Sequence, residues 1–432
     1  DTIRFRSRCG YGEEGTHNHR VRVMTEDGTI QWRFLADVQA GDWIGIHRKT
    51  DLWAASPIDC RELKPDLKTC HKTVRLPDVI DEAWGTLLGV LVGDGTWGRP
   101  GQIEATVGPY PEWLRQVCAI FESTVGVPVI REVKRTKRAY RVQFDSRVVR
   151  QFLHNLGFTL KTGSDAKRVP WAIMQSPKPV VAAFLRGLFE TDGSAERGGR
   201  IVSFSTASPK LASEVQLLLL NFGIVCRIKP RWNKRFKKWY QCVTVLGAES
   251  VRLFAEQIGF LSERKASLLR SHIAKGNLGN KSATEAIPHQ RAWCRRLLES
   301  VPKNNGNAAA GKLGWRRSLL RAAFGNVIKN AKDVLSYPRL RASLAVAREV
   351  GADQQVITHF EEILSAGYFF DEVVEVSQSR GQVYDLTMPD GASFVANGMT
   401  NHNTTLSGVF ASYEVYRLLN LLHCLVYRVE IR

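Results

Sequence analysis

The chain has 432 residues, 44% of them hydrophobic, and a formal net charge of +19 at pH 7. Its length predicts two or three domains, and its basic excess favours a polyanionic partner such as nucleic acid over an inert basic surface. Its eight cysteines include no CxxC pair, which argues against a zinc ribbon or a disulfide scaffold and favours a cytoplasmic location. No signal peptide or membrane-length apolar run is present, so we expect no membrane partner.

Residues 1–50 alternate between apolar and polar side chains and contain turn sequences, which predicts short antiparallel strands. Asp27-Gly28 is typical of a hairpin turn between two of these strands. The stretch has too few strands to close a core alone, so we expect it to pair with another part of the chain.

A Thr-x-x-His sequence, from Thr16 to His19, lies in this region. A hydroxyl and an imidazole at this spacing can polarise a peptide bond and protonate its leaving nitrogen. Taken alone, the same pattern is also what two surface histidines in a turn would give.

The central part of the chain contains a repeat. The strings LLGVLVGDG and LRGLFETDG end in Asp94-Gly95 and Asp192-Gly193, so the two aspartates are 98 residues apart (192 − 94). HNLGF and EQIGF extend the similarity downstream of each copy. A self-similar pair of this length predicts a duplicated unit with pseudo-two-fold symmetry.

Small residues in each copy share one helix face. Gly89 and Gly93 are four apart in the first copy, as are Gly187 and Thr191 in the second. Two such helices can pack closely and bring their C-terminal ends, with the two aspartates, side by side. The paired carboxylates would then hold divalent metal ions, although two ordinary core helices that end in Asp-Gly turns would have similar sequences.

These strings resemble the LAGLIDADG motif of homing endonucleases. The resemblance implies an α/β domain of two repeats that cleaves double-stranded DNA, with Mg²⁺ held by the catalytic residues Asp94 and Asp192. Lys161 and Lys167 resemble a family segment with a lysine ahead of a proline, which implies that Lys167 is a catalytic cation near the scissile phosphate. The competing interpretation is a protein of this fold that binds nucleic acid as a maturase or regulator without cutting it; the acidic residues at both motif ends argue against it.

A basic hairpin pattern follows each copy of the repeat. A two-stranded ribbon fits the major groove of DNA, whereas basic residues on exposed strands otherwise often prevent aggregation. Because the two hairpins occupy matching positions, we predict DNA contacts by Arg131, Lys134, Arg135, Lys137, Arg138 and Arg141 in the first and by Arg227, Lys229, Arg231, Lys234, Arg235, Lys237 and Lys238 in the second.

Near the C-terminus, two short strand patterns flank an Asn397-Gly398 turn and lead into His402, Asn403 and Thr404. The Asn side-chain amide can attack its own backbone carbonyl and cut the chain after itself. The neighbouring His can move the proton, and the Thr hydroxyl can carry an acyl group.

This junction resembles the C-terminal splice junction of an intein, and the Thr-x-x-His sequence resembles the intein motif at the N-terminal junction. The resemblance implies an all-β Hint domain that splices a host extein in cis without a cofactor. It assigns catalytic roles to Thr16, His19, Asp385, His402, Asn403 and Thr404. In that family a nucleophilic Cys or Ser lies tens of residues before Thr-x-x-His; Cys9 is too close, so we expect the N-terminal splicing segment to be missing.

The sequence from Thr404 onward has a helical pattern and resembles the start of a phage terminase large subunit just after its P-loop, but the Gly-rich loop needed for ATPase activity is absent. We expect a monomer of the α+β multidomain class. Its expected parts are the Hint domain (1–50 and 368–403), a linker (51–80), the two-repeat endonuclease (81–265), a basic helical accessory segment (266–367) and a C-extein fragment (404–432).

Overall fold

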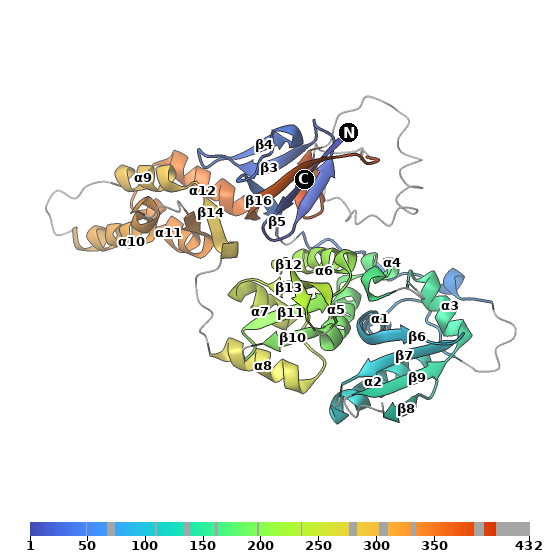
Figure 1. Ribbon diagram of the computed structural model, residues 1–432. Coiled ribbons are helices and arrows are strands. Elements are labelled where there is room, and N and C mark those ends of the chain that lie inside the picture. The colour runs from blue at the N-terminus through green and yellow to red at the C-terminus, as the bar shows by residue number, and fades with distance from the viewer. Residues whose placement is uncertain are drawn as a thin grey trace. The chain divides into compact units, whose positions relative to one another are not determined.

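The computed structural model describes residues 1–48, 50–66, 74–108, 110–133, 139–159, 163–196, 198–234, 236–275, 283–301, 310–329, 334–383 and 393–402. It is an α+β structure whose chain divides into two compact units (Figure 1). The sheet unit comprises Asp1–Thr50 and Gly279–Arg432, and the repeat unit comprises Asp51–Leu278. No helix among the described residues is both long and apolar enough to cross a membrane.

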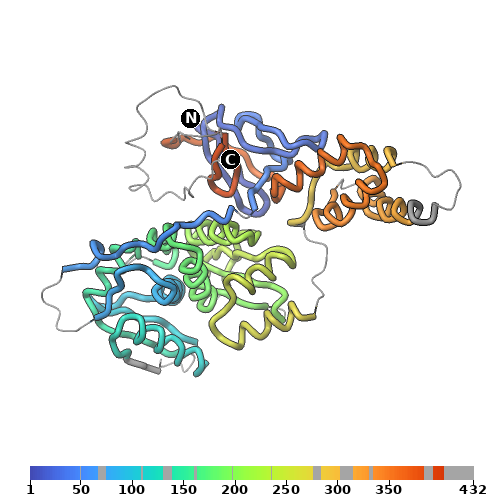
Figure 2. The backbone as a smooth tube through the Cα atoms, turned by 180° about the vertical axis from the view of Figure 1, so that it is seen from behind, coloured from blue at the N-terminus to red at the C-terminus, as the bar shows by residue number. Residues whose placement is uncertain are grey.

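Eight of the described strands of the sheet unit form one sheet (Figures 1 and 2). In it, β16 (Tyr368–Ser379) pairs antiparallel with β1 (Thr2–Ser7), where Val376 lies opposite Phe5, and with β5 (Trp43–His47), where Phe370 lies opposite Gly45. The N-terminal strands, too few to close a core alone, are completed by this distant segment. The strands are β1 (Thr2–Ser7), β2 (Gly12–Gly15), β3 (Arg20–Met24), β4 (Ile30–Phe34), β5 (Trp43–His47), β16 (Tyr368–Ser379), β17 (Ser393–Ala396) and β18 (Met399–His402).

Both predicted hairpin turns are confirmed. Between β3 and β4, the Thr25 amide donates to the Thr29 carbonyl at 2.9 Å, and Gly28 has a φ of +82°. Between β17 and β18, Asn397 and Gly398 have φ angles of +51° and +80°. Left-handed backbone at both central residues suits a two-residue hairpin turn, and Asn-Gly adopts it at little cost.

A helical subdomain follows in the same unit. It contains η4 (Ala283–Glu285), β14 (Ala286–Pro288), α9 (Arg291–Ser300), α10 (Ala310–Lys329), β15 (Val334–Ser336), α11 (Tyr337–Glu349) and α12 (Gln354–Ala366). Leu297, Phe324 and Phe360 are fully buried in its core, which extends to Met24 and Trp43 of the sheet. The four helices match the helical patterns in the sequence. The two strands were not foreseen, because three residues are too few to show an alternating pattern.

The repeat unit contains two copies of one arrangement of helices and strands. The first copy has α1 (Glu82–Asp94), β6 (Gly95–Trp97), β7 (Gln102–Val107), α2 (Pro111–Val125), β8 (Ile130–Val133), β9 (Tyr140–Asp145) and α3 (Arg147–Asn155). After η3 (Ser164–Ala166) and α4 (Trp171–Met174), the second has α5 (Lys178–Asp192), β10 (Gly193–Glu196), β11 (Ile201–Thr206), α6 (Pro209–Asn221), β12 (Cys226–Asn233), β13 (Lys238–Val245) and α7 (Ala248–Gln257), followed by α8 (Glu263–Ala274). The two sheets have equivalent strand orders, β6-β7-β9-β8 and β10-β11-β13-β12, which confirms the predicted duplication.

The described part of residues 51–80 is irregular apart from a short turn of helix, η2 (Arg61–Leu63), and an isolated bridge. It packs on the repeat unit through side-chain amides. Leu52 donates to Asn221 Oδ1 at 3.1 Å and accepts from its Nδ2 at 2.7 Å, while Asn155 Nδ2 donates to the Leu63 carbonyl at 2.8 Å. The segment is therefore held along the repeat unit and is not a loose tether.

Candidate functional site

The two motif helices, α1 and α5, pack with their backbones in contact. A Cβ atom built on Gly89 would lie 2.1 Å from the carbonyl oxygen of Phe184. One built on Gly187 would lie 2.5 Å from the carbonyl oxygen of Thr86. Only glycine permits this approach from either side, as expected from the small residues in the repeat.

This packing brings the ends of the two helices together. A Cβ on Gly93 would lie 1.9 Å from Thr191 Oγ1, so the residues immediately before the two aspartates touch. Asp94 and Asp192 are the last residues of α1 and α5. Helix C-termini carry partial negative charge, so two carboxylates at this point create a strongly negative locus that favours cations.

Burial raises the pKa of the Asp192 carboxyl above its ordinary value, against the opposing effect of Lys167 and Lys265. The pKa of Lys265 is lowered by its burial, and the negative charge of Asp94 opposes that effect. Both aspartates therefore lie within electrostatic range of the same ammonium group. The predicted convergence of the motif ends is observed.

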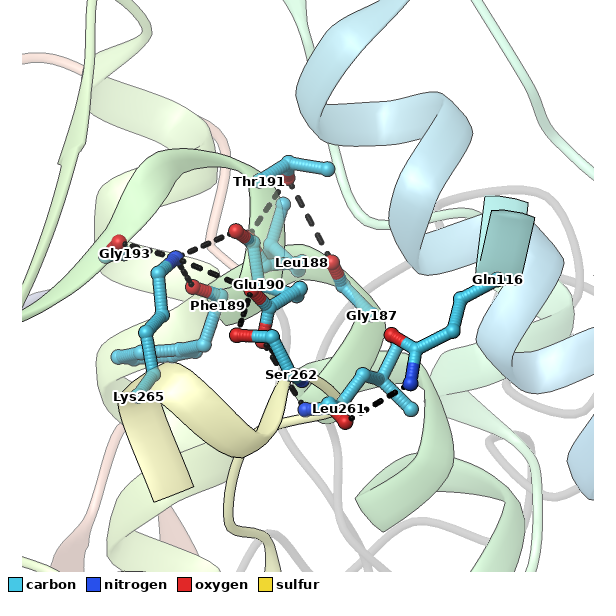
Figure 3. Close-up of polar contacts among 10 residues, drawn as sticks. All are labelled: Gln116, Gly187, Leu188, Phe189, Glu190, Thr191, Gly193, Leu261, Ser262 and Lys265. Carbon is cyan, nitrogen blue, oxygen red and sulfur yellow. Dashed lines mark hydrogen bonds and ion pairs between the residues drawn. The ribbon is translucent and has the colours of Figure 1, made fainter. Parts of the chain in front are cut away.

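Lys265, on α8, is buried beside the end of α5 (Figure 3). Its Nζ donates to the carbonyl oxygens of Phe189 at 3.2 Å, Glu190 at 2.5 Å and Gly193 at 2.8 Å. The Glu190 carbonyl belongs to the last turn of α5, where carbonyl oxygens lack intrahelical donors and a cation satisfies them well, whereas the Phe189 carbonyl also accepts from the Gly193 amide. Burial lowers the pKa of Lys265, with Glu190 opposing that effect.

Glu190 fixes the position of Lys265 by holding the start of α8 (Figure 3). Its Oε2 accepts from the amides of Leu261 and Ser262, both at 3.0 Å, and its Oε1 accepts from Ser262 Oγ at 2.7 Å. A buried carboxylate at a helix N-terminus is stabilised by these amides and by the helix dipole. The lysine is thus held on a rigid support.

Lys167 has the equivalent role in the first copy. Its Nζ donates to the carbonyl of Gly93, next to Asp94. Its backbone is fixed from α6, because Ser208 Oγ donates to the Lys167 carbonyl at 2.7 Å and the Val169 amide donates to Glu214 Oε2 at 2.8 Å. The structure thus places the Lys167 ammonium at the end of α1, and its catalytic role stays a prediction.

Lys265 was missed by the sequence reasoning, although a signal for it exists. The offset of 98 residues that relates the two aspartates also carries Lys167 to Lys265 (167 + 98). A lysine at the same offset in both copies was detectable before the structure was known.

The donor set fits a hard divalent cation. Carboxylate oxygens suit Mg²⁺, which keeps several waters and takes further oxygens from phosphate. Among the described residues, no group of three or more His, Cys, Asp or Glu side chains could enclose an ion. The pair Asp94 and Asp192 therefore suits an ion shared with substrate, and a cation there would relieve the cost of a desolvated carboxylate.

Two hollows adjoin the helix ends. One of about 230 Å³ is lined by residues that include Asp94, Tyr110, Glu190, Arg264 and Lys265. The other, of about 480 Å³, is lined by residues that include Trp97, Phe158 and Lys167. Each hollow carries one of the two lysines.

The predicted basic hairpins are both present. In β12–β13, Lys229, Arg231, Lys234, Lys237 and Lys238 are exposed and Arg227 is half-buried. In β8–β9, Arg141 is half-buried and forms an ion pair with Glu104 at 3.2 Å. Arg131 lies on β8, but its side chain is outside the described part of the structure. The described residues also exclude five other predicted contacts: Lys134, Arg135, Lys137, Arg138 and Arg235.

Two tryptophans accompany the basic residues of the second hairpin. Trp232 and Trp239 lie opposite each other, edge to face at 5.4 Å, and are 46% and 59% exposed. Aromatic surface left this open among exposed cations is typical of a nucleic-acid interface, where the rings contact sugars and bases.

In the sheet unit, Thr16 and His19 lie in the β2–β3 turn, closed by a hydrogen bond from the His19 amide to the Thr16 carbonyl at 3.0 Å. His19 Nε2 lies 2.8 Å from Asn401 Oδ1 on β18. His402, at the end of β18, packs edge to face on Trp32 at 5.1 Å. Asp385, Asn403 and Thr404 lie outside the described residues.

The repeat unit can now be compared with known proteins. Residues 179–259 match a LAGLIDADG-like domain. They extend through α5 to α7 and therefore cover the second copy, with Asp192 and the exposed hairpin. The structure is also similar to mesophilic variants of the homing endonuclease I-DmoI, at 14% identity over 45% of this chain and 99% of that one, with a TM-score of 0.33.

Curated relatives match over much more of the chain. The replicative DNA helicase DnaB of Synechocystis sp. is 25% identical over 96% of this chain and 44% of the helicase. Elongation factor 2 of Methanopyrus kandleri is 25% identical over 78% of this chain and 24% of the elongation factor. One subunit of the DNA gyrase of Mycolicibacterium flavescens is 25% identical over 94% of this chain and 66% of the gyrase subunit. This chain spans less than half the length of the helicase and about a quarter of the elongation factor.

Proposed function

We propose that the repeat unit is a metal-dependent endonuclease that makes site-specific double-strand breaks in DNA. The observation that carries this proposal is the meeting of Asp94 and Asp192 at the touching ends of α1 and α5, with Lys167 and Lys265 bonded to the same helix ends. Two carboxylates able to hold a metal ion, with two flanking cations, suit in-line hydrolysis of a phosphodiester.

In this proposal Asp94 and Asp192 hold Mg²⁺, which when bound activates water and stabilises the leaving oxygen. Lys167 and Lys265 place positive charge beside the reacting phosphate, and their bonds to backbone carbonyls keep them there before substrate arrives. The exposed cations of β12–β13 hold the DNA backbone and base edges.

The test is cleavage of DNA that carries the uninterrupted host site, with and without Mg²⁺. We expect cleavage only with the metal, and its loss in Lys265→Met with little change in DNA affinity. Binding without cleavage under all metal conditions would contradict the nuclease and favour a protein that only binds nucleic acid.

We further propose that the sheet unit is a Hint domain that performs protein splicing. A helicase, an elongation factor and a gyrase are different proteins, yet each is similar to a long stretch of this chain. A self-splicing insert accounts for this pattern, because it moves between hosts without changing their activity. The sheet supports the proposal, since its strands come from both sides of the repeat unit's sequence.

In this second activity Asn403 cyclises with proton transfer by His402, Thr404 accepts the acyl group, and Asp385 orients the junction. Thr16 and His19 act on the N-terminal junction. The residues after Asn403 then belong to a host extein that resembles a phage terminase large subunit, and the chain works as a cytoplasmic monomer.

Mass spectrometry tests the splicing proposal. We expect the purified chain to release the 29 residues after Asn403 (432 − 403), and Asn403→Ala to abolish the release. Release that continues in Asn403→Ala would show that another bond or a contaminating protease is responsible.

A further inference from the structure

Asn401 is a polar residue at a fully buried position of β18, two residues before the proposed cyclising Asn403. Its side chain contacts His19, 382 positions earlier in the chain. A buried amide left without hydrogen-bond partners is costly, so its hydrogen bonds determine its orientation.

Those bonds fix the orientation of the Asn401 amide. Nδ2 donates to the carbonyl oxygens of Met399 at 3.1 Å and Ala396 at 3.4 Å. A flipped amide would direct its own oxygen at two carbonyl oxygens, which is repulsive. Oδ1 therefore faces His19 Nε2 at 2.8 Å. Because an amide oxygen only accepts, Nε2 must carry the hydrogen.

The surroundings of His19 hold its ring in place. A Cβ on Gly15 would lie 3.2 Å from His19 Cγ, so the ring lies directly over a glycine. The His19 carbonyl accepts from the Leu35 amide at 2.7 Å. With Nε2 committed to Asn401, the neutral ring has its lone pair on Nδ1, which becomes the nitrogen able to accept or return a proton.

Glu13, on β2, completes the buried polar group. Burial raises its pKa to about 8, against hydrogen bonds from the side chains of Asn397 and Asn401. At neutral pH the carboxyl is therefore mostly protonated, and it places no negative charge beside the amide that fixes His19.

We propose that Asn401 is a positioning residue for splicing, which fixes His19 in the Nε2–H tautomer and ties the Thr16–His19 turn to the strand that leads into His402 and Asn403. This inference rests on the proposed splicing function for its consequence, although the tautomer is a property of the folded chain alone. Asn401 acts through His19 and touches no reacting atom.

The first experiment is ¹⁵N NMR of the histidine-labelled full chain, with the His19 signals assigned from His19→Gln. We expect a protonated Nε2 and an unprotonated Nδ1 in the neutral ring. Asn401→Val should convert this pattern to a mixture of tautomers, while Glu13→Gln, which mimics the neutral acid, should leave it unchanged. An Nδ1–H tautomer in the unmodified chain would overturn the proposal. This result needs no variant, so the proposal can be refuted even if Asn401→Val fails to fold.

The second experiment measures release of the segment after Asn403. Although His19 acts on the N-terminal junction, its contact with Asn401 also holds β18, the strand that leads into Asn403. We therefore expect Asn401→Val and His19→Gln each to slow release about tenfold, and the double variant to be no slower than either, since both remove one shared interaction. Additive effects would overturn the coupling. If the unmodified chain releases nothing, the splicing proposal fails, while the NMR result still decides the Asn401–His19 contact.

Discussion

The two units build their reactive groups in opposite ways. In the repeat unit, Asp94 and Asp192 end two similar helices, and each copy supplies one lysine at the same sequence offset. In the sheet unit, His19 and Asn401 come from distant parts of the chain and meet only because β18 pairs with β3. Duplication creates a site by repeating a local pattern, whereas the sheet creates one by long-range register. The first kind leaves a signature in the sequence and the second does not.

The largest effect should come from breaking the duplicated pair. We expect Asp94→Asn or Asp192→Asn to lower DNA cleavage by at least about 10³-fold, because each removes a metal-holding charge. Single-turnover cleavage in Mg²⁺ measures this. Glu112→Gln is the matched control, since Glu112 lines the same hollow as Asp94 but is exposed and lies outside the motif. Equal losses in all three variants would mean that general negative charge matters and the motif pair does not.

The next effect concerns the buried acid of the sheet unit. Glu13 has a folded-state pKa of about 8 against an ordinary value of 4.5. Between these values the folded state holds a proton that the unfolded state has lost, so the stability it contributes falls as pH rises through this window. Glu13→Gln should match the unmodified chain at pH 5 and exceed it at pH 9 by on the order of 3 kcal/mol.

Denaturant unfolding of the sheet unit at the two pH values checks this expectation. Glu14→Gln is the control on the adjacent residue, because hydrogen bonds from Thr2 and Arg4 lower the pKa of Glu14. Its stability difference from the unmodified chain should be nearly the same at the two pH values, because both lie above the pKa of Glu14 in the folded and unfolded states. A flat profile for Glu13→Gln would contradict the burial of an uncharged carboxyl.

A third test disturbs the helix contact on which the duplicated site depends. Gly89→Ala should destabilise the repeat unit by about 2 kcal/mol, because the new Cβ overlaps the Phe184 carbonyl and the backbone must move. Gly325→Ala is the control: a Cβ there meets nothing within 4 Å on α10, so it should be neutral or slightly stabilising. Thermal unfolding measures both, and equal effects would sink the close-packing explanation.

The smallest effect should come from the exposed hairpin. Replacing Lys229 and Arg231 by Gln should weaken DNA binding modestly and reduce the slope of log affinity against log salt by about one for each lost phosphate contact. Arg252→Gln is the control, because Arg252 is bonded to Glu249 and Glu256 on its own helix. An unchanged salt slope in the hairpin variant would place the DNA elsewhere.

Much of the repeat unit could be predicted from the sequence. The glycines and the aspartates repeat at one offset, a basic hairpin follows each copy, and each of these patterns reports a local structure. Lys265 followed the same offset but was overlooked, because the flanking residues differ between the copies. Glu13 and Asn401 could not be predicted. Their burial depends on how strands from opposite ends of the chain align, and neither residue type at its position indicates a buried site.

The placement of β18 near residue 400 determines when the sheet unit can be completed during synthesis. β3 and β5 leave the ribosome early, but their partner strand emerges only after the whole repeat unit has been made. Domains fold as units while translation proceeds, so the repeat unit has time to fold before β18 exists. The His19–Asn401 contact can therefore form only after the repeat unit has been synthesised, and the turn at Thr16–His19 acquires its final geometry later than the repeat unit does.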